Sequence, residues 1–148
     1  MGRILVAYDG SEDSKLALKR AITNAKLRGD EVIILEVIEV EPGRYKMYGD
    51  TMHVAQEEAK KALKALGKLR QQINEPKMKI EVKTRVGHPV EEIVREAEES
   101  EVDVIYVGSK GLSGLSRVLM GSVAEGVVRH APCNVIVVRR RIGEVSGS

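Results

Sequence analysis

The chain has 148 residues, of which 43% are hydrophobic and 31% charged, so we expect one globular domain spanning residues 1–148. It contains no Trp or Phe, so its core must be aliphatic, and its formal net charge is only +2. This balance argues against a dedicated nucleic-acid binder, because such proteins carry a concentrated basic face and often aromatic rings that stack on bases.

The lone cysteine, Cys133, cannot form an internal disulfide, so the cysteine content gives no indication of a secreted protein. The N-terminus leads directly into an apolar run of about five residues, too short for a signal-peptide core or a membrane span. We therefore expect a cytoplasmic protein that makes no membrane contact. The basic run at residues 139–141 is interpreted as a solvated exit from a strand, with a partner or membrane contact as the alternative, and residues 139–148 as a frayed tail.

The first half of the chain alternates strand-like and helix-like patterns. Residues 4–8 form an apolar run, and apolar residues then recur at helical spacing up to Gly29, with Ser11 as the predicted N-cap. Residues 32–38 are almost continuously apolar, as in a central parallel strand covered on both faces. A polar loop is predicted at residues 41–50, followed by a long amphipathic helix.

The second half continues the alternation. Residues 78–86 alternate apolar and charged side chains, which predicts a half-exposed strand near a sheet edge. Pro89 fits the first turn of a third helix, and strands are predicted at residues 102–107 and 134–138 with a helix between them. The pattern predicts an α/β fold, a three-layer doubly wound domain with a five-stranded parallel sheet.

Two predicted strand ends carry residues suited to a ligand, and in open α/β sheets ligands bind at these ends. The end of the fourth strand leads through the glycine-rich residues 108–114 to Ser122, and Ser122 and Glu125 have capping-box spacing. A helix starting there, preceded by glycines, offers backbone N–H groups to an anion. The alternative is an ordinary glycine turn with a helix cap, since neither standard phosphate-binding glycine motif is present.

The end of the first strand is acidic. Glu12 and Asp13, in the first turn of the predicted helix, would repel phosphates, so the phosphates are expected at the other loop. Asp9 could then bind ribose hydroxyls or a magnesium ion, or it could simply form an Asx turn.

The spacing Gly108-x-x-Gly111, then nine residues, then Gly121-Ser122 resembles the G-2x-G-9x-G-[ST] signature of the ATP-binding branch of the universal stress protein family. The likeness extends to the opening residues 4–11, the turn at residues 87–89 and the closing residues 132–138. It implies an adenine nucleotide α-hydrolase-like fold.

The resemblance also implies roles for residues at the base and ribose end of the cleft. Ala7 and Tyr8 would line the base end, although the ring of Tyr8 could crowd the base instead. Asp9 would contact the ribose or a metal ion, Val37 would meet adenine through its backbone, and Val107 would pass beneath the nucleotide.

Other positions are implied at the phosphate end. Gly108 would pass beneath the nucleotide, and the phosphates would be wrapped by Gly111, Gly121, Ser122 and Val123. Two neighbouring residues stay open: Lys110 either reaches a phosphate or faces solvent, and His88 either touches a ligand or belongs only to its turn.

The resulting hypothesis is a protein that holds ATP, with Mg²⁺ or Mn²⁺, as a regulatory or stress-response switch, with weak hydrolysis at most. The alternatives are a nucleotide-independent interaction module of the same fold, or an enzyme such as a phosphohydrolase or slow ATPase. The resemblance further implies a homodimer that pairs through the strand at residues 135–138, and a partner protein that the sequence does not identify.

Overall fold

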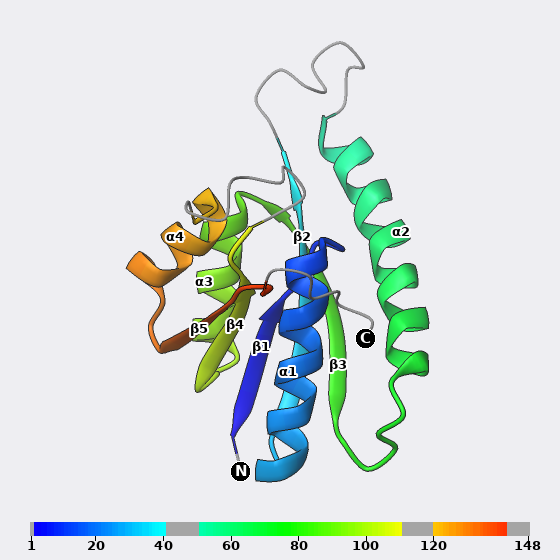
Figure 1. Cartoon of the computed structure of the whole chain (residues 1–148). Coiled ribbons are helices and arrows are strands. Elements are labelled where there is room, and N and C mark those ends of the chain that lie inside the picture. The colour runs from blue at the N-terminus through cyan, green and yellow to red at the C-terminus, as the bar shows by residue number, and fades with distance from the viewer. Residues whose placement is uncertain (1, 41–50, 111–119, 142–148) are drawn as a thin grey trace.

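The computed structural model describes residues 2–40, 51–110 and 120–141. Strands and helices alternate along the chain (Figure 1). Their bounds are β1 (Arg3–Ala7), α1 (Glu12–Arg28), β2 (Glu31–Glu39), α2 (Thr51–Gln72), β3 (Ile80–Gly87), α3 (Pro89–Glu99), β4 (Val104–Gly108), α4 (Ser122–His130) and β5 (Asn134–Val138). The predicted loop at residues 41–50 lies outside the described residues.

All five strands run parallel in the order β3-β2-β1-β4-β5, which confirms the predicted doubly wound sheet. Ala7, at the end of β1, is in register with Leu35 of β2 on one side and with Val107 of β4 on the other. The carboxyl ends of these three central strands therefore lie together at the same end of the sheet. The predicted edge strand at residues 78–86 is β3, and β5 forms the opposite edge.

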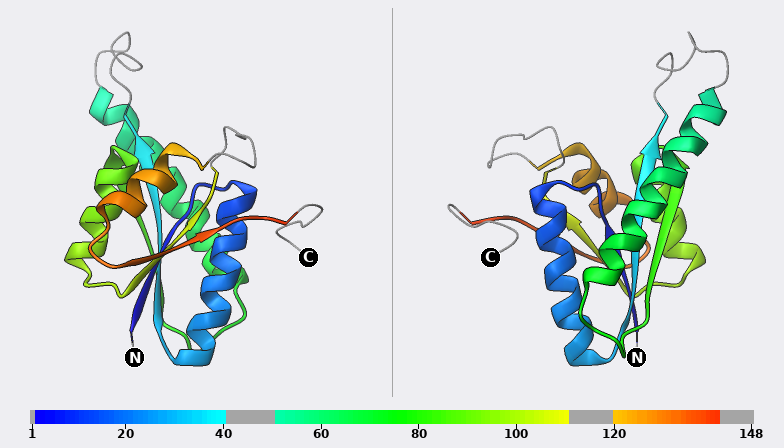
Figure 2. Two further views of the ribbon diagram at one scale, coloured as in Figure 1. Left: turned by 60° about the vertical axis from the view of Figure 1, so that its left-hand side comes forward. Right: turned by 90° about the vertical axis from the view of Figure 1, so that its right-hand side faces the viewer.

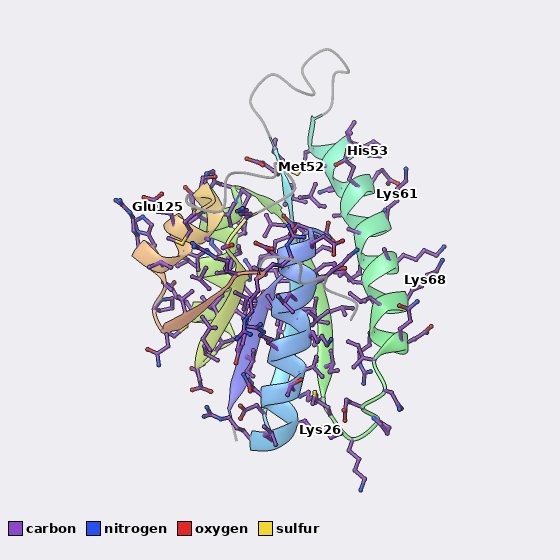
Figure 3. All side chains as sticks on the ribbon, in the orientation of Figure 1. Lys26, Met52, His53, Lys61, Lys68 and Glu125 are labelled. Atoms are coloured by element: carbon purple, nitrogen blue, oxygen red, sulfur yellow. The ribbon has the colours of Figure 1, made fainter. Side chains whose placement is uncertain are left out.

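Two aliphatic cores cover the two faces of the sheet, because successive strand residues point to opposite sides. Ile4 and Val6 pack with α1 and α2, whereas Leu5 and Ala7 pack with α3 and α4. Figure 2 shows the two helix pairs on opposite faces of the sheet. On the outer side of α2, Lys61 and Lys68 point away from the sheet (Figure 3). No helix in the described ranges combines the length and the apolar character that crossing a bilayer requires.

The helix ends test the predicted caps. The Ser11 hydroxyl accepts a hydrogen bond from the Ser14 N–H at 3.2 Å, and Gly29 ends α1 in the left-handed conformation, so both predictions are confirmed. Helix α4 begins at Ser122 as expected, but the predicted capping box is wrong. Gly121 occupies the N-cap position, Ser122 is the first helical residue, and Glu125 pairs with Arg129 instead.

A cluster of charged side chains joins α3 to β3. Glu96 is only 1% exposed and accepts hydrogen bonds from Lys83 Nζ and Arg85 Nε, each at 2.9 Å, and from the Ser100 hydroxyl. Arg85 also bonds Glu92 and Glu99. Burying an ionised carboxylate costs free energy unless it is paired and hydrogen-bonded, so these contacts keep Glu96 ionised between α3 and β3.

Candidate functional site

A cleft of about 470 Å³ opens at the carboxyl ends of β1, β2 and β4. The strand order reverses at this point. From β1 the chain continues to β2 and β3 on one side of β1, and it then returns to β4 and β5 on the other side. Ligands of doubly wound proteins bind at such a switch point, and the volume lies in the usual range of small-molecule sites.

One wall of the cleft is apolar and belongs to the core under α3 and α4. Helix α3 contributes Pro89 and Ile93, the first turns of α4 contribute Val123, and three strand ends complete the wall with Ala7, Val37 and Val107. A flat apolar group such as a nucleobase would bury its faces against side chains of this kind.

The rim of the cleft is acidic. Asp9, Glu36, Glu39 and Glu58 line it, and Lys110 is the one cationic side chain among the described lining residues. Burial raises the pKa of the Glu36 carboxyl, and the charge of Asp9 raises it further. An anionic ligand at this rim would need a cation beside it, because carboxylates repel phosphates and bind hard divalent ions.

Asp9 forms the predicted Asx turn: its Oδ1 accepts a hydrogen bond from the Ser11 N–H at 2.9 Å. The residue is nevertheless exposed and lines the cleft, so the turn fixes the carboxylate at the mouth of the site. The described residues contain no group of three side chains placed to hold a metal ion.

Tyr8 touches the cleft but packs its ring on the opposite side from the apolar wall. It lies against the core formed with α1 and α2, beside Leu18 and Ile22 of α1. Burial raises the pKa of its phenol, and nearby Glu36 and Asp9 add to the shift, whereas Lys15 opposes it. The alternation along β1 explains this side, because Tyr8 follows Ala7 and so faces the other way.

The glycine motif is partly described. Gly108 and Val123 line the cleft, whereas Gly121 and Ser122 lie at the start of α4 and are not lining residues. Gly111 lies outside the described residues. A Cβ atom on Gly108 would stand 2.8 Å from the backbone carbon of Asp13, so the first turn of α1 packs directly against this glycine.

Two charged residues differ from the sequence prediction. Arg140 was expected to be solvated, but its Nε donates to Asp13 Oδ1 at 2.8 Å, while Arg139 and Arg141 are exposed. Asp13 is only 4% exposed and its charge is balanced by this arginine. This pairing offsets the repulsion of phosphates that the sequence predicts for Asp13. The rest of the predicted tail, from residue 142, lies outside the described residues.

Sequence reasoning missed several lining residues, among them Glu36 and Glu58. Glu36 interrupts the apolar run of β2, which was the available signal, whereas Glu58 reaches the cleft only through the packing of α2. Lys110 is half-buried and lines the cleft, and His88 is exposed and does not line it. Cys133 is half-buried beside the core under α3 and α4, as expected of a small apolar residue.

Comparison with known sequences decides the family. The sequence model of the universal stress protein family matches residues 1–139. The chain belongs to the universal stress protein family. Universal stress protein MJ0531 of Methanocaldococcus jannaschii is 36% identical over 145 residues, which cover 93% of this chain and 82% of that protein.

Solved structures of this universal stress protein fold agree. The structure of hypothetical protein MJ0577 superposes with a TM-score of 0.82 at 31% identity, covering 95% of this chain and 96% of the other. A universal stress protein in complex with cAMP superposes with a TM-score of 0.60 at 29% identity, covering 93% of this chain and 95% of the other. At least one relative with this fold therefore holds an adenine nucleotide.

Proposed function

We propose that this universal stress protein binds an adenine nucleotide in the cleft, with ATP and Mg²⁺ or Mn²⁺ as the physiological ligand. The observation that carries the proposal is the cleft itself, which combines an apolar wall, an acidic rim and the N-terminus of α4 at one sheet edge. The relative in complex with cAMP supports an adenine nucleotide of some kind.

The base would lie against Ala7, Val37 and Val107, with Tyr8 closing the far side. Asp9 would use its second carboxylate oxygen for a ribose hydroxyl or for the metal ion, because its first is held in the turn. The positive charge of the metal ion would balance the negative charges of the rim carboxylates and of the phosphates.

The phosphates would lie over Gly108 and toward the start of α4. There Ser122 and Val123 offer N–H groups with no helical partner, and the helix dipole favours negative charge. Gly121, whose own N–H donates to the Ser109 carbonyl, would let the phosphates approach because it has no side chain. Gly111 would complete this set. Nothing in this arrangement assigns a general base to orient water, so the protein would hold ATP as a regulatory or stress-response switch.

Purified protein should release a nucleotide on denaturation, which mass spectrometry of the supernatant would identify. The apo protein should bind ATP in the presence of Mg²⁺, and Asp9→Asn should weaken this binding about 10-fold, because a contact to a charged group contributes about 1.5–3 kcal/mol. Glu98→Gln, an exposed change near the other end of α3, is the matched control. No released nucleotide and no binding at millimolar ATP would refute the proposal.

We also propose that the protein is cytoplasmic and that it forms a homodimer through β5. In the described sheet β5 pairs only with β4, and Ile136 on it is 41% exposed, so an apolar edge stays open. Light scattering should give a dimeric mass for the wild type and a smaller mass for Ile136→Lys. Leu27→Lys, at an 80% exposed site on α1, should leave the mass unchanged. A monomeric wild type would contradict the dimer.

A further inference from the structure

A buried carboxylate outside the cleft lining carries a further role. Asp13 lies in the first turn of α1, and both of its oxygens are engaged. Ser109 Oγ donates to Oδ2 at 2.8 Å, and Arg140 Nε donates to Oδ1 at 2.8 Å. These three residues come from the start of α1, the end of β4 and the segment after β5, so one buried group joins segments 96 and 127 residues apart.

Ser109 extends this cluster to the glycine motif. The residue is fully buried, and its backbone N–H donates to the Val138 carbonyl, the last of β5, at 2.8 Å. Its own carbonyl accepts a hydrogen bond from the Gly121 N–H at 2.6 Å. The two residues that flank the central part of the motif, Ser109 and Gly121, are thus bonded to each other directly.

We propose that Asp13, Ser109 and Arg140 form a positioning cluster that fixes Ser109 against Gly121 and so sets the phosphate-binding N-terminus of α4. The inference rests on the proposed function. It adds that the end of β5 is coupled to the nucleotide site, because Val138 bonds Ser109 and Arg140 belongs to the cluster. None of the three needs to touch the ligand, so they are positioning residues.

The sign of one substitution separates positioning from charge. Asp13→Asn removes a negative charge near an anionic ligand, so a pure charge effect would tighten the binding of Mg·ATP. Loss of positioning would weaken it, and we expect a Kd raised about 10-fold by titration calorimetry, as for the loss of one contact to a charged group. Glu12→Gln is the matched control, since it removes a charge from the same helical turn, where Glu12 pairs with Lys15, and it should not raise the Kd.

A second readout needs no nucleotide. Amide hydrogen exchange, followed by NMR on the apo protein, should show the Gly121 N–H exchanging at least tenfold faster in Asp13→Asn. The Gly29 N–H, which bonds the Ala25 carbonyl, serves as the reference and should be unchanged. If the wild type binds no ATP, the proposed function fails and the Gly121 exchange decides the cluster alone.

Arg140→Gln tests the same cluster from its partly exposed member, should Asp13→Asn fail to fold. We expect weaker Mg·ATP binding and faster Gly121 exchange, with Arg140→Lys recovering part of both and the control Arg139→Gln changing neither. Unchanged Gly121 exchange in folded Asp13→Asn and Arg140→Gln, or tighter ATP binding in Asp13→Asn, would overturn the proposal.

Discussion

Replacing Glu96 with glutamine should lower the free energy of unfolding at pH 7 by about 3 kcal/mol, the low end of the range for breaking a buried ion pair. The substitution leaves Lys83 and Arg85 facing an amide that cannot satisfy both donors. The low end applies because Arg85 keeps Glu92 and Glu99 and because both cations are partly exposed. Urea unfolding followed by circular dichroism would measure the change.

This loss should depend on pH. Burial alone would raise the pKa of Glu96, but hydrogen bonds from Ser100, Lys83 and Arg85 outweigh it, so the pKa in the folded protein is lowered. A lowered folded pKa gives stability that is present above the unfolded pKa, about 4.3, and is lost as the pH falls through the folded value. The difference between wild type and Glu96→Gln should be constant from pH 6 to 8 and shrink below about pH 4.

Glu98→Gln is the control for this series, because Glu98 lies on the same helix but is exposed. It should change stability by less than about 0.5 kcal/mol at any of these pH values. A difference for Glu96→Gln that stays the same down to pH 3 would show that its charge is not what stabilises α3 on β3.

The second large effect is expected at Gly121, where valine should weaken Mg·ATP binding at least about 100-fold, equivalent to losing two contacts to a charged group. The backbone there has φ −65° and ψ 155°, which any residue adopts, so the substitution introduces no backbone strain. The added side chain would instead stand where the phosphates approach the N–H groups of α4.

The stability cost of Gly121→Val should be about 1 kcal/mol or less, the usual cost of a poor N-cap residue. Gly67→Val provides the same chemical change on α2, where an added Cβ would meet no described atom within 4 Å apart from the neighbouring residues and backbone of its own helix, and should leave binding unchanged. Calorimetry and thermal unfolding of both variants would measure the two effects. Full ATP affinity in Gly121→Val would place the phosphates elsewhere.

Most of the fold could be predicted from the sequence because local patterns determine it. The apolar runs, the helical spacing and the caps at Ser11 and Gly29 each reflect interactions within a few residues. The predicted capping box is wrong for an equally local reason: Gly121 occupies the N-cap position, so Ser122 is the first residue of the helix.

The candidate site was predictable only in part, because some of its members are brought together by packing. Ala7, Val37 and Val107 are implied by the resemblance to the universal stress proteins, and they meet in the cleft because parallel strands end on the same side of a sheet. The bond between Asp13 and Arg140 joins residues 127 apart, and no periodicity indicates such a pair. The reach of Glu58 into the cleft likewise depends on how α2 packs beside β2 and β3.

The close packing of Gly108 on the backbone of Asp13 bears on how sequences of this family are read. A glycine is required there by the helix beneath it, whatever the cleft contains. Gly121 has φ −65° and ψ 155°, so its backbone conformation does not require glycine. Under the proposed function, the bound phosphates are what would exclude a larger side chain there. A relative that no longer binds a nucleotide is therefore expected to keep the glycine equivalent to Gly108 and to vary at the position of Gly121. The glycine at the position of Gly121 is thus the better indicator of nucleotide binding.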